Sequence, residues 1–142
     1  DGSSVIVRET GWADTGPQEQ LALAEDLLGN GKPPDYFIGS APAAEAVVSL
    51  KRMRDLNPGM AIIATYFTQA VRRGIMRDRI EAAPFDDPTL QGRLSVEYAV
   101  RAVEGTVDHR QIGPSIKLVT KSSLPPPSAL APADFEPVFA LP

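Results

Sequence analysis

Short apolar runs alternate with stretches of helical spacing along this chain. Residues 60–65 form an apolar run of the length of a buried strand, and residues 69–77 follow with Val71 and Ile75 on one side of a helix. Residues 79–83 then have the composition of another strand. This order of strand, helix and strand predicts a βαβ unit.

The same order occurs twice before this unit. Residues 5–9 (VIVRE) predict a strand, and Pro17 suits the start of a leucine-rich helix that runs to Gly29. Residues 36–39 predict a second strand, followed by a helix over residues 43–56. Strands that alternate with helices at this spacing are typical of a mostly parallel sheet with right-handed crossovers. The fold class is therefore α/β, a mostly parallel sheet with flanking helices.

The longest helix is predicted over residues 88–104, from Pro88 to the stop at Gly105. Its broad apolar stripe consists of Leu90, Leu94, Val96, Ala99, Val100 and Val103. Residues 112–120 predict a strand, whereas residues 124–142 are rich in Pro and Ala and predict loop with room for one turn of helix.

Composition narrows the function classes. The 142 residues suffice for one core, and a net charge of -4 argues against a nucleic-acid partner. The chain has no cysteine and a single histidine, His109, which we expect at the surface, so no metal site or cofactor is expected. No apolar run approaches the roughly 20 residues that span a bilayer. The chain opens at Asp1 without an export signal, and we expect a soluble, processed protein.

Polar and aromatic residues follow the predicted strands. In open α/β sheets a ligand binds beyond the carboxyl ends of the strands. The candidate ligand-binding residues at these ends are Trp12, Tyr66, Thr10, Asp14, Ser40, Thr65 and Asp86. From the residues alone, Trp12 is equally well explained as a loop residue packed on a helix, and Tyr66 as the edge of the core. Asp87 is placed to cap the helix that begins at Pro88, and Asp86 is the one of this pair that could face a cleft.

Four segments resemble the C-terminal half of type I periplasmic binding proteins. They are GSAPAAEAV (39–47), TYFTQAVRRGIMRDRIEAAP (65–84), QGRLSVEYAVRAVEG (91–105) and IGPSIKLVT (112–120). Trp12 together with Tyr66 and Phe67 favours the members of this family that sense trimethylamine N-oxide beside a sensor histidine kinase. The resemblance implies a non-enzymatic periplasmic sensor, in which Trp12 and Tyr66 surround the methylated nitrogen and a donor binds the oxide.

The family plan also implies how the chain is organised. Such proteins have two flavodoxin-like lobes around a cleft, and the chain resembles an incomplete C-terminal part of this plan. Residues 1–83 would be part of the second lobe, residues 84–120 a hinge crossing with a helix and strand that complete the first lobe and return, and residues 121–142 the tail. By analogy the opening strand of the second lobe is absent, and the long helix has no surface to cover its stripe. We expect another chain, a domain swap or a remainder of the protein to supply these surfaces.

Three other functions compete with the sensor. A receptor that delivers a sugar or another small ligand to an ABC importer is the nearest, and it would have polar walls in place of aromatic rings. A repressor effector domain would need a DNA-binding segment. An enzyme is the least favoured, because no dinucleotide, phosphate-loop or nucleophile-elbow motif is present. The basic run of Arg72, Arg73, Arg77 and Arg79 fits a solvated helix face better than a docking surface for a kinase.

Overall fold

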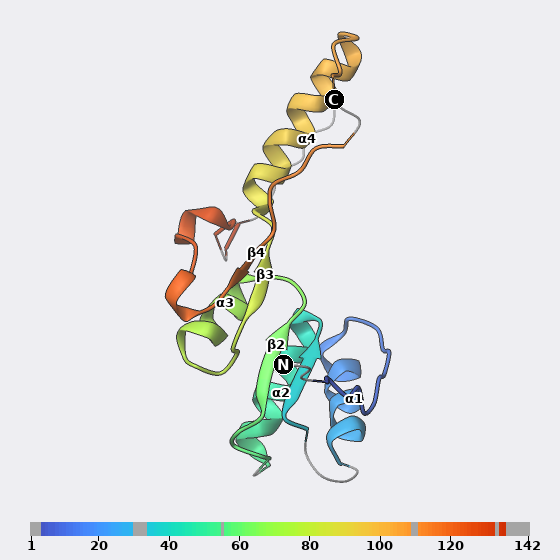
Figure 1. Ribbon diagram of the computed structural model, residues 1–142, viewed down its shortest axis with the longest axis vertical. Helices are drawn as coiled ribbons and strands as arrows, with labels where there is room; N and C mark the ends of the chain where they lie inside the picture. The colour runs from blue at the N-terminus through green and yellow to red at the C-terminus, as the bar shows by residue number, and fades with distance from the viewer. Residues whose placement is uncertain (1–3, 30–33, 55, 109–110, 133, 136–142) are drawn as a thin grey trace.

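A computed structural model describes residues 4–29, 34–54, 56–108, 111–132 and 134–135 (Figure 1). The helices are α1 (Pro17–Gly29), α2 (Ala41–Met53), α3 (Gln69–Met76) and α4 (Pro88–Val103), with short 3₁₀ turns η1 (Lys121–Ser123) and η2 (Pro127–Ala129). The strands are β1 (Tyr36–Gly39), β2 (Ala61–Ala64), β3 (Ala83–Phe85) and β4 (Lys117–Val119). His109 and residues 136–142 of the predicted tail lie outside the described residues.

The core forms where α2 packs between α1, α3 and the parallel pair of β1 and β2. Tyr36 lies opposite Ala61 and Gly39 opposite Ala64, so the two strands end at the same level. Val47 and Leu50 of α2 are almost fully buried, as are Ile62 of β2 and Val71 and Ile75 of α3. Burying an aliphatic side chain of this size contributes about 1.5–3 kcal/mol. The predicted α/β order is therefore confirmed around α2.

The other two strands, β3 and β4, form a second two-stranded sheet. Ile63 forms a parallel bridge with Ala82, and the Ala64 amide donates to the Ala82 carbonyl at 3.1 Å. Beyond this bridge β3 pairs with β4 in the antiparallel direction, with Ala83 opposite Val119. The described strands thus form one parallel pair and one antiparallel pair, and the antiparallel pair lies where the chain returns from α4 (Figure 1).

Two predicted strands are displaced. The strand expected over residues 79–83 lies at Ala83–Phe85, because residues 77–79 form a turn in which Asp78 has a positive φ of 53° and the Gly74 carbonyl accepts the Arg79 amide. The strand expected over residues 112–120 is shorter and consists of Lys117–Val119. Its length is set by β3, which offers three residues for pairing.

The prediction of a strand over residues 5–9 is wrong. This segment has no regular secondary structure, and Val5, Ile6 and Val7 are exposed. A strand needs a neighbour to satisfy its backbone groups, and within the described residues β1 pairs only with β2. Residues 5–9 therefore have the composition of a strand but no neighbouring strand to pair with among the described residues.

Helix α4 extends away from the rest of the molecule (Figure 1). None of its residues is buried, and Val96, Val100 and Val103 are 68%, 52% and 90% exposed. The expectation that its apolar stripe has no covering surface is thus confirmed for the described part of the chain. None of the helices described is long and apolar enough to cross a membrane.

Candidate ligand-binding site

Gln20 connects the loop before α1 to the end of β1. Its side-chain amide donates to the backbone carbonyls of Ala13, at 3.1 Å, and Asp14, at 2.7 Å. Its carbonyl oxygen lies 3.5 Å from the Ser40 hydroxyl. Gln20 is 5% exposed, so these contacts hold the loop of residues 10–16 beside the carboxyl end of β1.

Ser40 follows β1 directly and caps α2. Its hydroxyl accepts a hydrogen bond from the Ala43 amide at 3.3 Å. A Cβ on Gly39 would lie 2.9 Å from the Ala43 Cβ, so glycine permits the close approach of helix and strand at this point. The positive end of α2 therefore begins at the edge of the sheet where the candidate site lies.

Thr65 and Tyr66 follow β2 at the same level. The Thr65 amide donates to the Gly39 carbonyl at 2.8 Å, which joins the two strand ends. Tyr66 is 42% exposed, whereas Phe67 is buried and packs edge-on against Phe85 with ring centroids 5.3 Å apart. Phe67 is thus a packing residue, whereas Tyr66 presents part of its ring to solvent.

Asp86 and Asp87 follow β3. Asp87 caps α4 by accepting from the Leu90 amide at 3.0 Å, as predicted, and it has a positive φ of 48°. Asp86 is half-buried, and its backbone carbonyl accepts from the Gln91 side chain at 3.0 Å. The Asp86 carboxylate makes no hydrogen bond among the described residues, which leaves it available beyond the end of β3.

Trp12 does not follow a strand, because residues 5–9 do not form one. Gly11 packs against α1, where its Cβ position would meet the Leu23 side chain at 2.6 Å. Trp12 itself is 94% exposed and forms no ring contact with Tyr66 within the described chain. The interpretation of Trp12 as a residue packed on a helix is therefore wrong.

Ser40 and Thr65 lie at the carboxyl end of the β1–β2 pair, whereas Asp86 lies farther along, because β3 continues past the end of β2. Ser40, Thr65 and Asp86 follow β1, β2 and β3, and the Gln20 contacts hold Asp14 beside the carboxyl end of β1. Thr10 is exposed in the same loop as Trp12. Gln20 was not among the residues predicted from the sequence. Its position four residues before Ala24, on the same face of the helix, was a signal that its side chain would be buried. No group of three potential metal ligands occurs among the residues described.

Two hollows lie at the opposite end of the strands. One, of about 230 Å³, is lined by the C-terminal ends of α1 and α2, including Glu25 and Arg54, which form an ion pair at 2.7 Å. The other, of about 410 Å³, is lined by residues of α2 and of the segments that precede β2 and β3. Neither of these two hollows is lined by the candidate ligand-binding residues.

Comparison with known proteins gives relatives over almost the whole chain. The periplasmic protein TorT of Escherichia coli (strain K12) is 28% identical over 141 residues, which are 97% of this chain and 41% of TorT. The crystal structure of the TorS sensor domain–TorT complex in the presence of TMAO matches with a TM-score of 0.80 and 32% identity, over 92% of this chain and 45% of that chain.

A third match is a transport protein. The crystal structure of an ABC transporter solute binding protein from Bradyrhizobium sp. BTAi1, with bound bis-tris, has a TM-score of 0.76 and 38% identity over 95% of this chain and 41% of that chain. No family model matches the chain. The chain spans less than half the length of these relatives.

The α/β fold, with its parallel β1–β2 pair and flanking helices, and these matches identify the chain as part of a periplasmic binding protein. Within that class it is TorT-like. The prediction that the chain is not an enzyme is confirmed, because the proteins it resembles are binding proteins.

Proposed function

We propose that this chain is part of a periplasmic sensor that binds trimethylamine N-oxide and signals to a membrane sensor histidine kinase of a two-component system. The observation that carries the proposal is the match to TorT, which has been solved together with the TorS sensor domain in the presence of TMAO. The proposal assigns to this chain a ligand, a partner protein and a cellular compartment on the basis of that similarity. Ligand binding would bias the kinase only through a difference in affinity between open and closed receptor forms.

The ligand would lie at the carboxyl edge of the strands. Trp12 and Tyr66 are exposed, and their ring faces would suit methyl groups on a cationic nitrogen, each ring contributing about 0.5–2 kcal/mol once desolvated. The Tyr66 hydroxyl or the Trp12 indole N–H would donate to the oxide. The polar residues that would complete the site are Thr10, Asp14, Ser40, Thr65 and Asp86.

The same proposal assigns three parts to the chain. Residues 1–83 would be a partial second lobe, residues 84–120 a hinge crossing that completes the first lobe, and residues 121–142 the tail. The antiparallel β3–β4 pair supports this division, because the chain leaves the sheet through β3, forms α4 and returns through β4. A facing lobe would close over the exposed Trp12 and Tyr66.

Calorimetric titration of the full-length protein tests the proposal. The panel contains trimethylamine N-oxide, betaine and a set of sugars, and the 142-residue chain is the control. Saturable binding of the N-oxide by the full-length protein supports the sensor. If a sugar binds and the N-oxide does not, the sensor proposal is wrong.

The second candidate is a solute receptor of an ABC importer. It is favoured by the match to the Bradyrhizobium solute binding protein, which at 38% has the higher sequence identity of the two solved relatives. A receptor of this kind would bind its solute without binding a kinase sensor domain. A binding assay with the periplasmic domain of the sensor kinase from the same organism therefore separates the two functions.

A further inference from the structure

The hollow of about 410 Å³ at the amino ends of the strands has an apolar floor and a basic rim. It lies between the C-terminal part of α2, the segment before β2 and the turn that joins α3 to β3. The apolar lining residues, called the floor below, are Val48, Leu56, Pro58 and Ile62, and the charged lining residues are Lys51, Arg52, Asp78 and Arg79.

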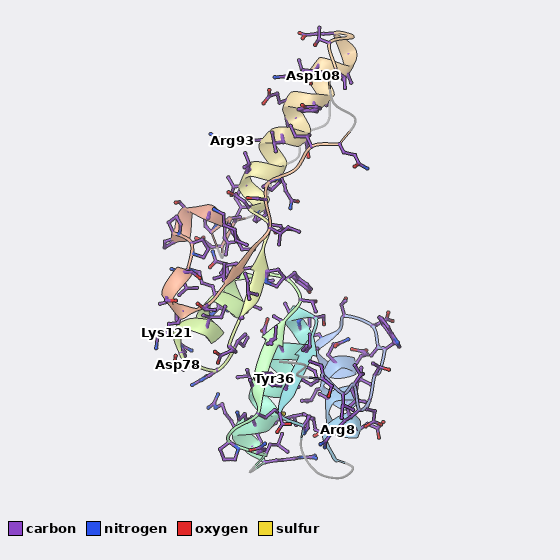
Figure 2. All side chains as sticks on the ribbon, in the orientation of Figure 1. Arg8, Tyr36, Asp78, Arg93, Asp108 and Lys121 are labelled. Atoms are coloured by element: carbon purple, nitrogen blue, oxygen red, sulfur yellow. The ribbon has the colours of Figure 1, made fainter. Side chains whose placement is uncertain are left out.

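Two of these charges already have partners. The Lys51 ammonium donates to the carbonyls of Pro58, at 2.9 Å, and Met60, at 2.6 Å, and so holds the segment that enters β2. The Asp78 carboxylate pairs with Lys121 of η1, and the two side chains lie side by side (Figure 2). The Lys51 ammonium is therefore committed to the backbone but keeps its positive charge, and the negative charge of Asp78 is offset by Lys121.

The guanidinium groups of Arg52 and Arg79 remain. Both residues are exposed, and neither side chain has an ion pair or hydrogen bond within the described part of the chain. This places two uncommitted positive charges beside one hollow in a chain whose net charge is -4. Arginine is well suited to bind a carboxylate with two parallel hydrogen bonds.

We propose that this hollow is a docking site for an acidic segment of a partner protein, with Asp or Glu on the two arginines and an apolar side chain on the floor. The exposed position of the arginines favours a protein segment over a small anion, because a small anion would need converging donors in a closed cavity. Met53, next to Arg52, is 66% exposed, and methionine and arginine are both enriched in protein interfaces.

The site would operate independently of the carboxyl edge. Its lining comes from the amino ends of β2 and β3, whereas Ser40, Thr65 and Asp86 follow the other ends of the strands. A partner bound in the hollow would therefore leave the proposed ligand site uncovered. The inference does not depend on which ligand the protein senses or transports.

The test uses an array of hexapeptides that combine Glu or Asp with Leu or Phe in every order. A matched array carries Gln or Asn in place of the acids. The full-length protein is compared with R52Q/R79Q, and with R73Q/R93Q as a control that removes the same charge from exposed positions of α3 and α4. Circular dichroism verifies that all three proteins keep the same fold.

We expect the full-length protein and R73Q/R93Q to bind a subset of the acidic peptides, and R52Q/R79Q to bind that subset at least about tenfold more weakly, with the difference reduced at high salt. Equal binding by R52Q/R79Q would overturn the proposal. So would an array in which no acidic peptide is bound better than its amide counterpart, or an equal loss in R73Q/R93Q.

Discussion

The side-chain amide of Gln20 donates to the backbone carbonyl of Asp14 at 2.7 Å, and through its other end Gln20 reaches the Ser40 hydroxyl at 3.5 Å. One buried amide thus spans from the loop before α1 to the junction of β1 and α2. This contact joins the loop that contains Trp12 to that junction.

Gln20→Leu removes the amide while keeping a side chain of similar size. We expect the free energy of unfolding to fall by about 1–3 kcal/mol, because two hydrogen bonds to the loop are lost, each with a net contribution of about 0.5–1.5 kcal/mol. Hydrogen exchange should become faster at amides of residues 10–16. Gln18→Leu is the matched control, since Gln18 is exposed on the same helix. Unchanged exchange in Gln20→Leu would show that Gly11 packing alone holds the loop.

Trp12→Ala and Tyr66→Phe should each weaken ligand binding by the full-length protein without lowering its stability. Trp12 is 94% exposed, so its truncation removes little packing, whereas a cage would lose one aromatic face. The affinity for trimethylamine N-oxide should fall by about three- to thirtyfold for Trp12→Ala. Tyr36→Phe is the control for the loss of an exposed tyrosine hydroxyl away from the site. Unchanged affinity in both variants would remove these residues from the site.

Asp87→Ala should destabilise the start of α4. The carboxylate accepts from the Leu90 amide, and Asp87 adopts a left-handed backbone that alanine tolerates poorly. We expect a loss of about 0.5–2 kcal/mol in thermal or denaturant unfolding. Asp87→Asn should lose much less, because asparagine caps helices and accepts a positive φ. Asp86→Ala is the neighbouring control; an equal loss there would contradict the capping role.

Local periodicity predicted the helices and the strands β1 and β2, because the spacing of apolar residues within one element decides where each of them forms. The strand over residues 5–9 failed because a strand also needs a partner, and the partner is not a local property. The position of β3 failed for the same reason, since pairing with Val119 and the bridge to Ile63 decide where it lies.

The candidate site shows a similar division. Residues that follow strands, such as Ser40 and Thr65, were found from the rule that ligands meet the carboxyl ends of strands. Gln20 was not found in this way, because its role depends on a contact between α1 and the junction of β1 and α2. The exposure of Trp12 could not be read from its residue type, since the surface that would face it is not among the described residues.

Tyr98 should titrate later than an ordinary tyrosine. Partial desolvation raises its pKa, and the negative charge of Asp108, whose carboxylate accepts from the phenol at 3.2 Å, raises it further. A raised pKa means that the folded chain holds the phenol proton more tightly than the unfolded chain. The stabilisation is present below the ordinary tyrosine pKa of about 10, and it is lost as the pH rises through the raised value.

The measurement for Tyr98 is ultraviolet absorbance of the ionised phenol during an alkaline titration. Tyr98→Phe should remove the transition that belongs to Tyr98. Asp108→Asn should move that transition to lower pH, because the repulsion between the carboxylate and the phenolate is gone. If Asp108→Asn leaves the transition where it was, Asp108 does not set the Tyr98 pKa.

Finally, one chemical change at two positions tests whether the apolar stripe of α4 is uncovered. Val96→Thr replaces a methyl group by a hydroxyl at a side chain that is 68% exposed, and Val47→Thr does the same at a side chain that is 0% exposed. Val47→Thr should lower the free energy of unfolding by about 1–3 kcal/mol, because a hydroxyl is buried in the core. Val96→Thr should change it by at most about 0.5 kcal/mol in the 142-residue chain. In the full-length protein Val96→Thr should be destabilising if another part of the receptor covers α4, and an equally small effect there would show that the stripe stays open to solvent.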